Sequence, residues 1–138
     1  VRRQRQMCLR GGGGWTPHDR AGWGVAQVQQ GRLTGAMFGS LPGYDQTVPR
    51  AELYSLRAVL PMVLPPATIW MDHANHVNAI LKGRQWCCNP ARPNVDLWQI
   101  IWNSIDDIGG IGEDCLQVLY TPAHTVERPG ETEDQRLN

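Results

Sequence analysis

The sequence predicts a mixed α/β domain, because two strand-like segments near its start are followed by alternating helical and strand-like segments. The first two segments, 21–28 and 32–41, flank the turn Gln29-Gln30-Gly31 and are expected to pair as an antiparallel hairpin. With 138 residues, of which 41% are hydrophobic, the chain is long enough to bury a core. We therefore expect one mixed sheet with helices packed on it.

The first helix is expected to begin after Thr47, whose side chain can cap its amino end. Pro49 suits the first turn, apolar residues then recur at helical spacing, and Pro61 ends the helix. An apolar run over 67–71 follows and predicts a buried strand.

Two more helices and a final strand are predicted in the second half of the chain. Val77, Ile80 and Leu81 are expected on one face of a short helix. The segment 95–108 has the clearest amphipathic periodicity, and 116–121 has the pattern of the last strand.

The composition excludes few classes of function. The net charge is zero, with 13 basic and 13 acidic residues, which neither indicates nor excludes a nucleic-acid partner. No run approaches the roughly 18 apolar residues of a membrane span, so we expect no membrane association. The four cysteines form no C-x-x-C pair, which favours reduced thiols and an intracellular compartment.

Two acidic residues stand where predicted elements meet. Glu52 is expected in the first turn of the first helix, and Asp72 directly follows the strand 67–71. Close-set carboxylates repel unless a divalent cation neutralises them, so the pair points to hard-metal chemistry. Each acid also has an ordinary explanation: Glu52 would favour the helix dipole, and Asp72 would cap the next helix.

Two further segments lie at informative places: the helix at 95–108 is opened by NVDLWQ (94–99), and His124 follows the last predicted strand. Together with Glu52 and Asp72, over roughly residues 21–124, they resemble the type 1 ribonuclease H domain. The resemblance implies an RNase H-like fold with a mixed five-stranded sheet. It also implies cleavage of the RNA strand of RNA–DNA hybrids with two Mg²⁺ or Mn²⁺ ions.

The resemblance also implies roles for individual residues. Glu52, Asp72 and a further acid would hold the metal ions, and His124 would help water or product to leave. In the family that further acid opens a final helix, and Asp134 has a suitable spacing here. Three neighbouring acids are rivals for the same place: Glu127, Glu131 and Glu133.

The segment KGRQWCCNPARP (82–93) is similar to the basic handle region with which some family members grip the hybrid. Four of its side chains are expected to contact phosphates or sugars: Lys82, Arg84, Trp86 and Arg92. An ordinary charged surface loop is the alternative. Thr47 matches a family position that holds a phosphate of the DNA strand, although helix capping alone also explains it.

The resemblance fails in the first 20 residues. The family's first strand is central and carries the leading catalytic aspartate, but here Arg5 or Gln6 occupies about that place. No acid occurs before Asp19, and the segment lacks the apolar run of a buried central strand. We therefore separate an atypical or poorly ordered segment, 1–20, from an RNase H-like domain over 21–138.

These features favour a ribonuclease H whose hydrolysis is impaired. The alternative is a catalytically inactive RNase H-like module that binds nucleic acid or scaffolds a larger polyprotein, as in retroelement-derived proteins. Another nuclease or integrase of the same superfold, and a purely structural domain with chance motifs, are the remaining interpretations. Hybrid cleavage that depends on Glu52 distinguishes the first from the others.

Overall fold

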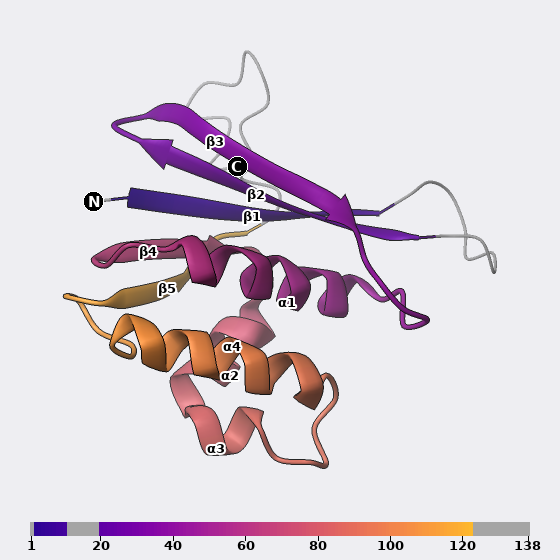
Figure 1. The fold of residues 1–138 in the computed structure, drawn as a ribbon. Helices are drawn as coiled ribbons and strands as arrows, with labels where there is room; N and C mark the ends of the chain where they lie inside the picture. Colours follow the sequence, from indigo (N-terminus) through magenta and orange to yellow (C-terminus); the bar gives the residue numbers. More distant parts are fainter. Residues whose placement is uncertain (1, 11–19, 123–138) are drawn as a thin grey trace.

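The structure is a computed structural model that describes residues 2–10 and 20–122. Its strands are β1 (Arg2–Arg10), β2 (Ala21–Gln29), β3 (Arg32–Ser40), β4 (Ala67–Met71) and β5 (Leu116–Tyr120). Its helices are α1 (Val48–Val59), α2 (Ala74–Lys82), α3 (Arg84–Cys87) and α4 (Val95–Ile108), and a 3-10 turn, η1 (Leu60–Met62), follows α1. Figure 1 shows the sheet above and these helices together on one side of it.

The sheet is mixed, with the strand order β3-β2-β1-β4-β5. β1 pairs antiparallel with β2 and parallel with β4, while β2 pairs antiparallel with β3 and β4 parallel with β5. The predicted mixed α/β class, an antiparallel hairpin followed by alternating helices and strands, is confirmed. β4 and β5 run parallel, so the residues that follow these two strands lie at one edge of the sheet.

Local signals account for the elements that carry the site. Gln30 and Gly31 both have positive φ, at 51° and 77°, which suits the tight turn between β2 and β3. β4 and α4 have the predicted bounds. α1 ends at Val59, and Pro61, predicted to stop the helix, lies within the 3-10 turn that follows.

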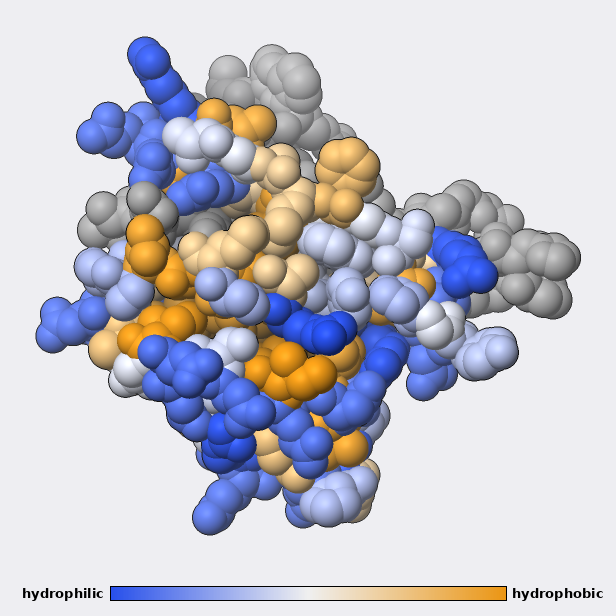
Figure 2. Space-filling view, viewed as in Figure 1, coloured by the Kyte–Doolittle hydropathy of each residue, from blue (hydrophilic) through white to orange (hydrophobic). Residues whose placement is uncertain are grey.

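The core lies between the sheet and the layer formed by α1 and α4. Helix α1 contacts β1, β2 and α4, and its Leu53, Leu56 and Val59 are buried. α4 adds the largest apolar side chains, including Trp98 and Trp102. Hydrophilic residues cover most of the lower part of this face (Figure 2), as expected for the outer surface of a helical layer.

One predicted helix face is wrong. Leu81 is 69% exposed, while His76, Val77, Ala79 and Ile80 are buried on α2. A helix turns by about 100° per residue, so the buried face of α2 that contains His76 and Ala79 is centred away from Leu81. A polar residue therefore takes the place expected for an apolar one.

β1 lies in the middle of the sheet, between β2 and β4. Its residues come from the segment 1–20 that the sequence sets apart as atypical. The strand sequence RRQRQMCLR has no apolar run, so its central position is not evident from the chain alone. Cys87, Cys88 and Cys115 are free thiols, as predicted for reduced cysteines. Within residues 2–10 and 20–122, no helix has the length and apolar character needed to cross a bilayer.

Candidate active site

Glu52 is a buried acid on α1. The helix begins at Val48, so Glu52 is its fifth residue, and no acid lies in the first turn. The expected favourable contact with the helix dipole fades within the first turn, and that explanation no longer applies. Glu52 is only 1% exposed, although carboxylates are rarely buried this fully.

Asp72 directly follows the last residue of β4 and is half-buried. The residue at the N-cap of α2 is His73, not Asp72, so the capping explanation for this acid is wrong. Thr121, the residue after β5, donates a backbone hydrogen bond of 2.8 Å to the carbonyl of Met71. Asp72 therefore lies at the edge where the parallel strands end.

The neighbouring strand β1 supplies no acid to this edge. Arg5 pairs with Trp70, and counting two residues further along both strands brings Met7 level with Asp72. No residue from Arg2 to Arg10 is an aspartate or glutamate. Among the residues that the structure describes, no group of three or more His, Cys, Asp or Glu side chains is placed to hold a metal ion.

Five of the predicted site residues lie outside the described residues: His124, Glu127, Glu131, Glu133 and Asp134. The assignments of the mobile histidine and of the last acid therefore stay predictions.

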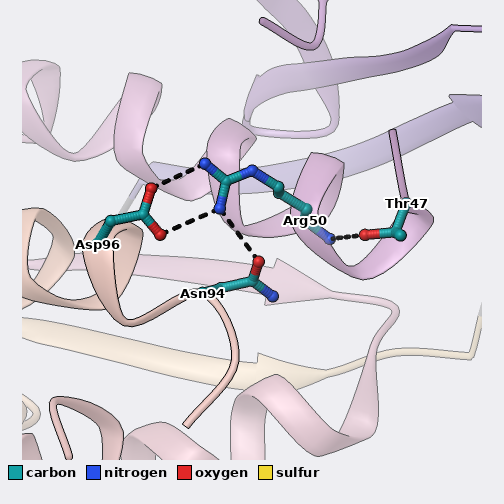
Figure 3. Close-up of polar contacts among 4 residues, drawn as sticks. All are labelled: Thr47, Arg50, Asn94 and Asp96. Carbon is teal, nitrogen blue, oxygen red and sulfur yellow. Dashed lines mark hydrogen bonds and ion pairs between the residues drawn. The ribbon is translucent and has the colours of Figure 1, made fainter. Parts of the chain in front are cut away.

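Thr47 caps α1, as predicted. Its hydroxyl accepts a hydrogen bond of 3.4 Å from the backbone N–H of Arg50. The guanidinium of Arg50 in turn donates to Asp96 at 3.1 and 2.8 Å and to Asn94 at 3.1 Å (Figure 3). These bonds tie the first turn of α1 to the amino end of α4, and they hold the pKa of Asp96 below its usual value.

The predicted handle residues divide into two groups. The Arg92 guanidinium carbon lies 3.4 Å from the centroid of the Trp86 ring, and the Lys82 ammonium lies 4.4 Å from it. Arg84 instead forms an ion pair with Asp106 at 2.6 Å and a hydrogen bond with Asn103 at 2.9 Å, both on α4. Lys82, Arg92 and the Trp86 ring thus share one surface. Arg84 instead links α3 to α4.

A cavity of about 220 Å³ lies beside this surface, and we call it the histidine cavity. Ten residues line it: Leu53, His73, Asn75, His76, Ala79, Trp86, Arg92, Pro93, Asn94 and Trp98. The rings of His73 and His76 stack at 3.9 Å between centroids, and Trp98 meets His76 edge-on at 6.0 Å. All four described helices, with the loop before α4, contribute to its walls.

The two imidazoles of the histidine cavity are unusual polar groups. The Nδ1 atoms of His73 and His76 are buried and have no hydrogen-bond partner among the described residues. Burial, with a smaller effect from His73, lowers the pKa of His76 to about 3. Burial also lowers the pKa of His73, and the nearby Asp72 opposes this shift. Neither histidine was predicted as a site residue from the sequence, although their i, i+3 spacing directly after Asp72 was visible there.

Comparison with known proteins tests whether the fold as a whole has relatives. No protein-family model matches the sequence, and no curated protein sequence matches it. Among solved structures, the chain is similar to LC9-RNase H1, a type 1 RNase H with the type 2 active-site motif. The TM-score is 0.61 at 15% identity, over 89% of this chain and 63% of that chain. The chain has a ribonuclease H-like fold.

This RNase H-like fold also occurs in a second similar structure, the foamy viral protease-reverse transcriptase in complex with dsDNA. The TM-score is 0.60 at 16% identity, over 88% of this chain and 80% of that chain. Since the present chain spans 63% of the length of the RNase H1 chain, the two are not equivalent from end to end. The predicted resemblance to an RNase H-like domain is confirmed at the level of the fold.

Proposed function

We propose that the chain is a ribonuclease H-like domain that binds RNA–DNA hybrids and hydrolyses their RNA strand with impaired efficiency. The observation that carries this proposal is the placement of two acids on an RNase H-like fold. Glu52 is buried on α1, beyond the turn where an acid serves the helix dipole, and Asp72 follows β4 without capping α2. Glu52 therefore does not serve the helix dipole, and Asp72 does not cap a helix.

The chemistry of the two acids fits hard divalent cations. Mg²⁺ and Mn²⁺ prefer oxygen ligands, and Mg²⁺ often uses one or two carboxylates together with water and substrate phosphates. Glu52, Asp72 and Asp134 would hold such ions, and His124 would help water or product to leave. When bound, the ions activate water and stabilise the leaving oxygen. The buried carboxylate of Glu52 is held by α1, so its position does not depend on a mobile loop.

The surface formed by Lys82, Trp86 and Arg92 suits the backbone of a nucleic acid. Its two cations would meet phosphates, and the indole ring would lie against a sugar. The hydroxyl of Thr47 accepts the capping bond with its oxygen, so its O–H remains a donor for a phosphate. Arg84 would also meet a phosphate, since its side chain is 42% exposed despite the ion pair.

A second function is favoured by the sequence of β1. The strand RRQRQMCLR has no acid, and its Arg5 is level with Trp70, two residues before Asp72. A cation there would repel metal ions, and the ions would lack a shared ligand. The second candidate is therefore an inactive module that binds hybrids, alone or within a larger polyprotein.

Cleavage of an end-labelled RNA–DNA hybrid with Mg²⁺ or Mn²⁺ tests the proposal. The parent chain is compared with Glu52→Gln and with the matched control Glu113→Gln, an exposed acid in a loop. We expect slow cleavage that Glu52→Gln abolishes and Glu113→Gln leaves unchanged. Equal cleavage by all three chains would contradict the proposed site. No cleavage by a folded parent that still binds the hybrid would select the inactive module.

A further inference from the structure

We propose that the histidine cavity binds a single nucleobase. The cavity combines aromatic walls, buried imidazole nitrogens without a partner among the described residues, and a cationic rim. A heteroaromatic base attached to a phosphorylated sugar suits all three. The inference concerns base binding by this chain and needs no hydrolysis.

The walls of the histidine cavity suit a flat aromatic ligand. Leu53, Ala79 and Trp98 are buried and apolar, and Trp86 adds a half-buried indole on another side. Bases stack on aromatic side chains whatever their sequence, because every base has a π-face. The volume of about 220 Å³ is below the roughly 300 Å³ at which pockets for drug-sized ligands begin. A single ring system therefore fits better than a larger ligand.

The buried imidazoles among the lining residues favour a ligand that forms hydrogen bonds. His76 is 93% buried, being 7% exposed, and its Nδ1 has no partner among the described residues. A buried polar atom without a partner costs free energy, which a bound ligand with a complementary donor or acceptor removes. A neutral imidazole has one donor and one acceptor nitrogen, and the edge of a base offers both kinds of group.

The rim of the cavity carries positive charge. Arg92 lines the cavity and lies over the Trp86 ring, and the Lys82 ammonium lies near the same ring. A base inside the cavity would therefore bring its sugar phosphate towards two cations. A second cavity, of about 260 Å³, offers a contrast, because none of its lining residues is charged or a histidine. Of these two cavities, both lined by described residues, the histidine cavity alone combines aromatic walls, unpartnered nitrogens and cations.

Titration of the whole chain with free nucleotides tests this inference. The probes are AMP and UMP, with ribose 5-phosphate as the probe that has the phosphate and no base, and binding is followed by quenching of tryptophan fluorescence. We expect at least one nucleotide to bind and ribose 5-phosphate to bind about tenfold more weakly or not at all. Equal binding of ribose 5-phosphate would show a phosphate site only and would overturn the inference.

Three variants and a matched control locate the binding. His76→Leu should weaken nucleotide binding about tenfold, while His76→Asn, which retains a hydrogen-bonding group near Nδ1, should keep most of it. Asn75→Tyr should block the cavity from the exposed side of α2, and Asn78→Tyr, exposed on the same helix and away from the cavity, should not. Unchanged binding in both His76→Leu and Asn75→Tyr would overturn the inference.

The test separates this inference from the proposed function. The titrations use no metal ion and no hybrid, so loss of hydrolysis in the parent chain does not affect them. Hybrid affinity is measured in parallel on Asn75→Tyr. If Asn75→Tyr loses nucleotide binding but retains hybrid cleavage or hybrid binding, the base site is separate from the acids. Hybrid binding without any nucleotide binding would overturn the base site and leave the proposed function standing.

Discussion

Arg50 of α1 and Asp96 of α4, separated by 46 positions in the chain, form a two-pronged ion pair with distances of 3.1 and 2.8 Å. The same guanidinium donates a third hydrogen bond to Asn94. Asn94 lines the histidine cavity, and Arg50 lies two residues before the buried Glu52. One contact thus joins a wall of the cavity to the helix that carries the buried acid.

Asp96→Asn should lower the free energy of unfolding only slightly, by less than about 1 kcal/mol, because the Asp96 side chain is 62% exposed and water screens the pair. The hydrogen bond from Arg50 lowers the pKa of Asp96 below 3.8. The stabilisation by this ion pair is therefore fully present above pH 3.8, the ordinary pKa of the group in the unfolded chain. It is lost as the pH falls through the lowered pKa of the folded chain. Urea unfolding of the parent and Asp96→Asn should differ near neutral pH and converge in acid. Asp107→Asn on the same helix serves as the control, and a difference that persists in acid would contradict the assignment.

The buried His76 should make the protein sensitive to acid. Its pKa is lowered from 6.5 to about 3 in the folded chain, so only the unfolded chain binds the proton between these values. The free energy of unfolding should then fall as the pH drops below 6.5, by at most about 1.4 kcal/mol per pH unit for one group. Urea unfolding between pH 7 and pH 4 measures this slope. His76→Leu should make it shallower, and parallel slopes in parent and variant would be inconsistent with a neutral buried imidazole.

Arg92→Ala should weaken hybrid binding and reduce its salt dependence. Each lost phosphate contact lowers the slope of log affinity against log salt by about 1. Arg32→Ala, an exposed arginine in the β2–β3 hairpin, is the matched control and should leave the slope unchanged. Fluorescence anisotropy of a labelled hybrid at several salt concentrations makes the comparison. Equal slopes for both variants would show that Arg92 does not contact a phosphate of the hybrid.

Gly109 should be intolerant of a side chain at the end of α4. It has a φ of +116°, and a Cβ atom there would lie 3.0 Å from the Cys115 Sγ. Gly109→Ala should therefore destabilise the fold by roughly 1–3 kcal/mol, the usual range for backbone strain of this kind. Gly112→Ala meets nothing within 4 Å and should be close to neutral. Thermal unfolding of the two variants compares them, and equal loss in both would mean that strain at Gly109 is not the cause.

Restoring an acid in β1 should recover hydrolysis if a single residue was lost. The sequence analysis places the missing aspartate near Arg5 or Gln6, while the strand register brings Met7 level with Asp72. We expect Gln6→Asp or Met7→Asp to raise metal-dependent cleavage of the hybrid more than Arg5→Asp does. Addition of Glu52→Gln to the best variant should abolish the gain. No recovery at any of the three positions would argue for wider decay of this strand.

Much of the fold was predictable, because its signals are local. The Thr47 cap, the strand at 67–71 and the helix at 95–108 each depend on neighbouring residues in the chain, and each is found as expected. The relation of Glu52 and Asp72 to their elements was predicted only in part. Their positions on α1 and after β4 were correct, the alternative roles as dipole partner and cap were wrong, and their role as metal ligands stays a prediction.

By itself, the sequence determined most of the helices and strands, with β1 and the short helix α3 as exceptions, since capping, periodicity and turns act over a few residues. Tertiary structure alone decided that the polar strand β1 lies at the centre of the sheet and that Arg50 reaches Asp96. It also decided that His76, not Leu81, faces the core. These outcomes depend on which surfaces meet across distant parts of the chain, and packing of that kind overrides local hydrophobic pattern where the two disagree.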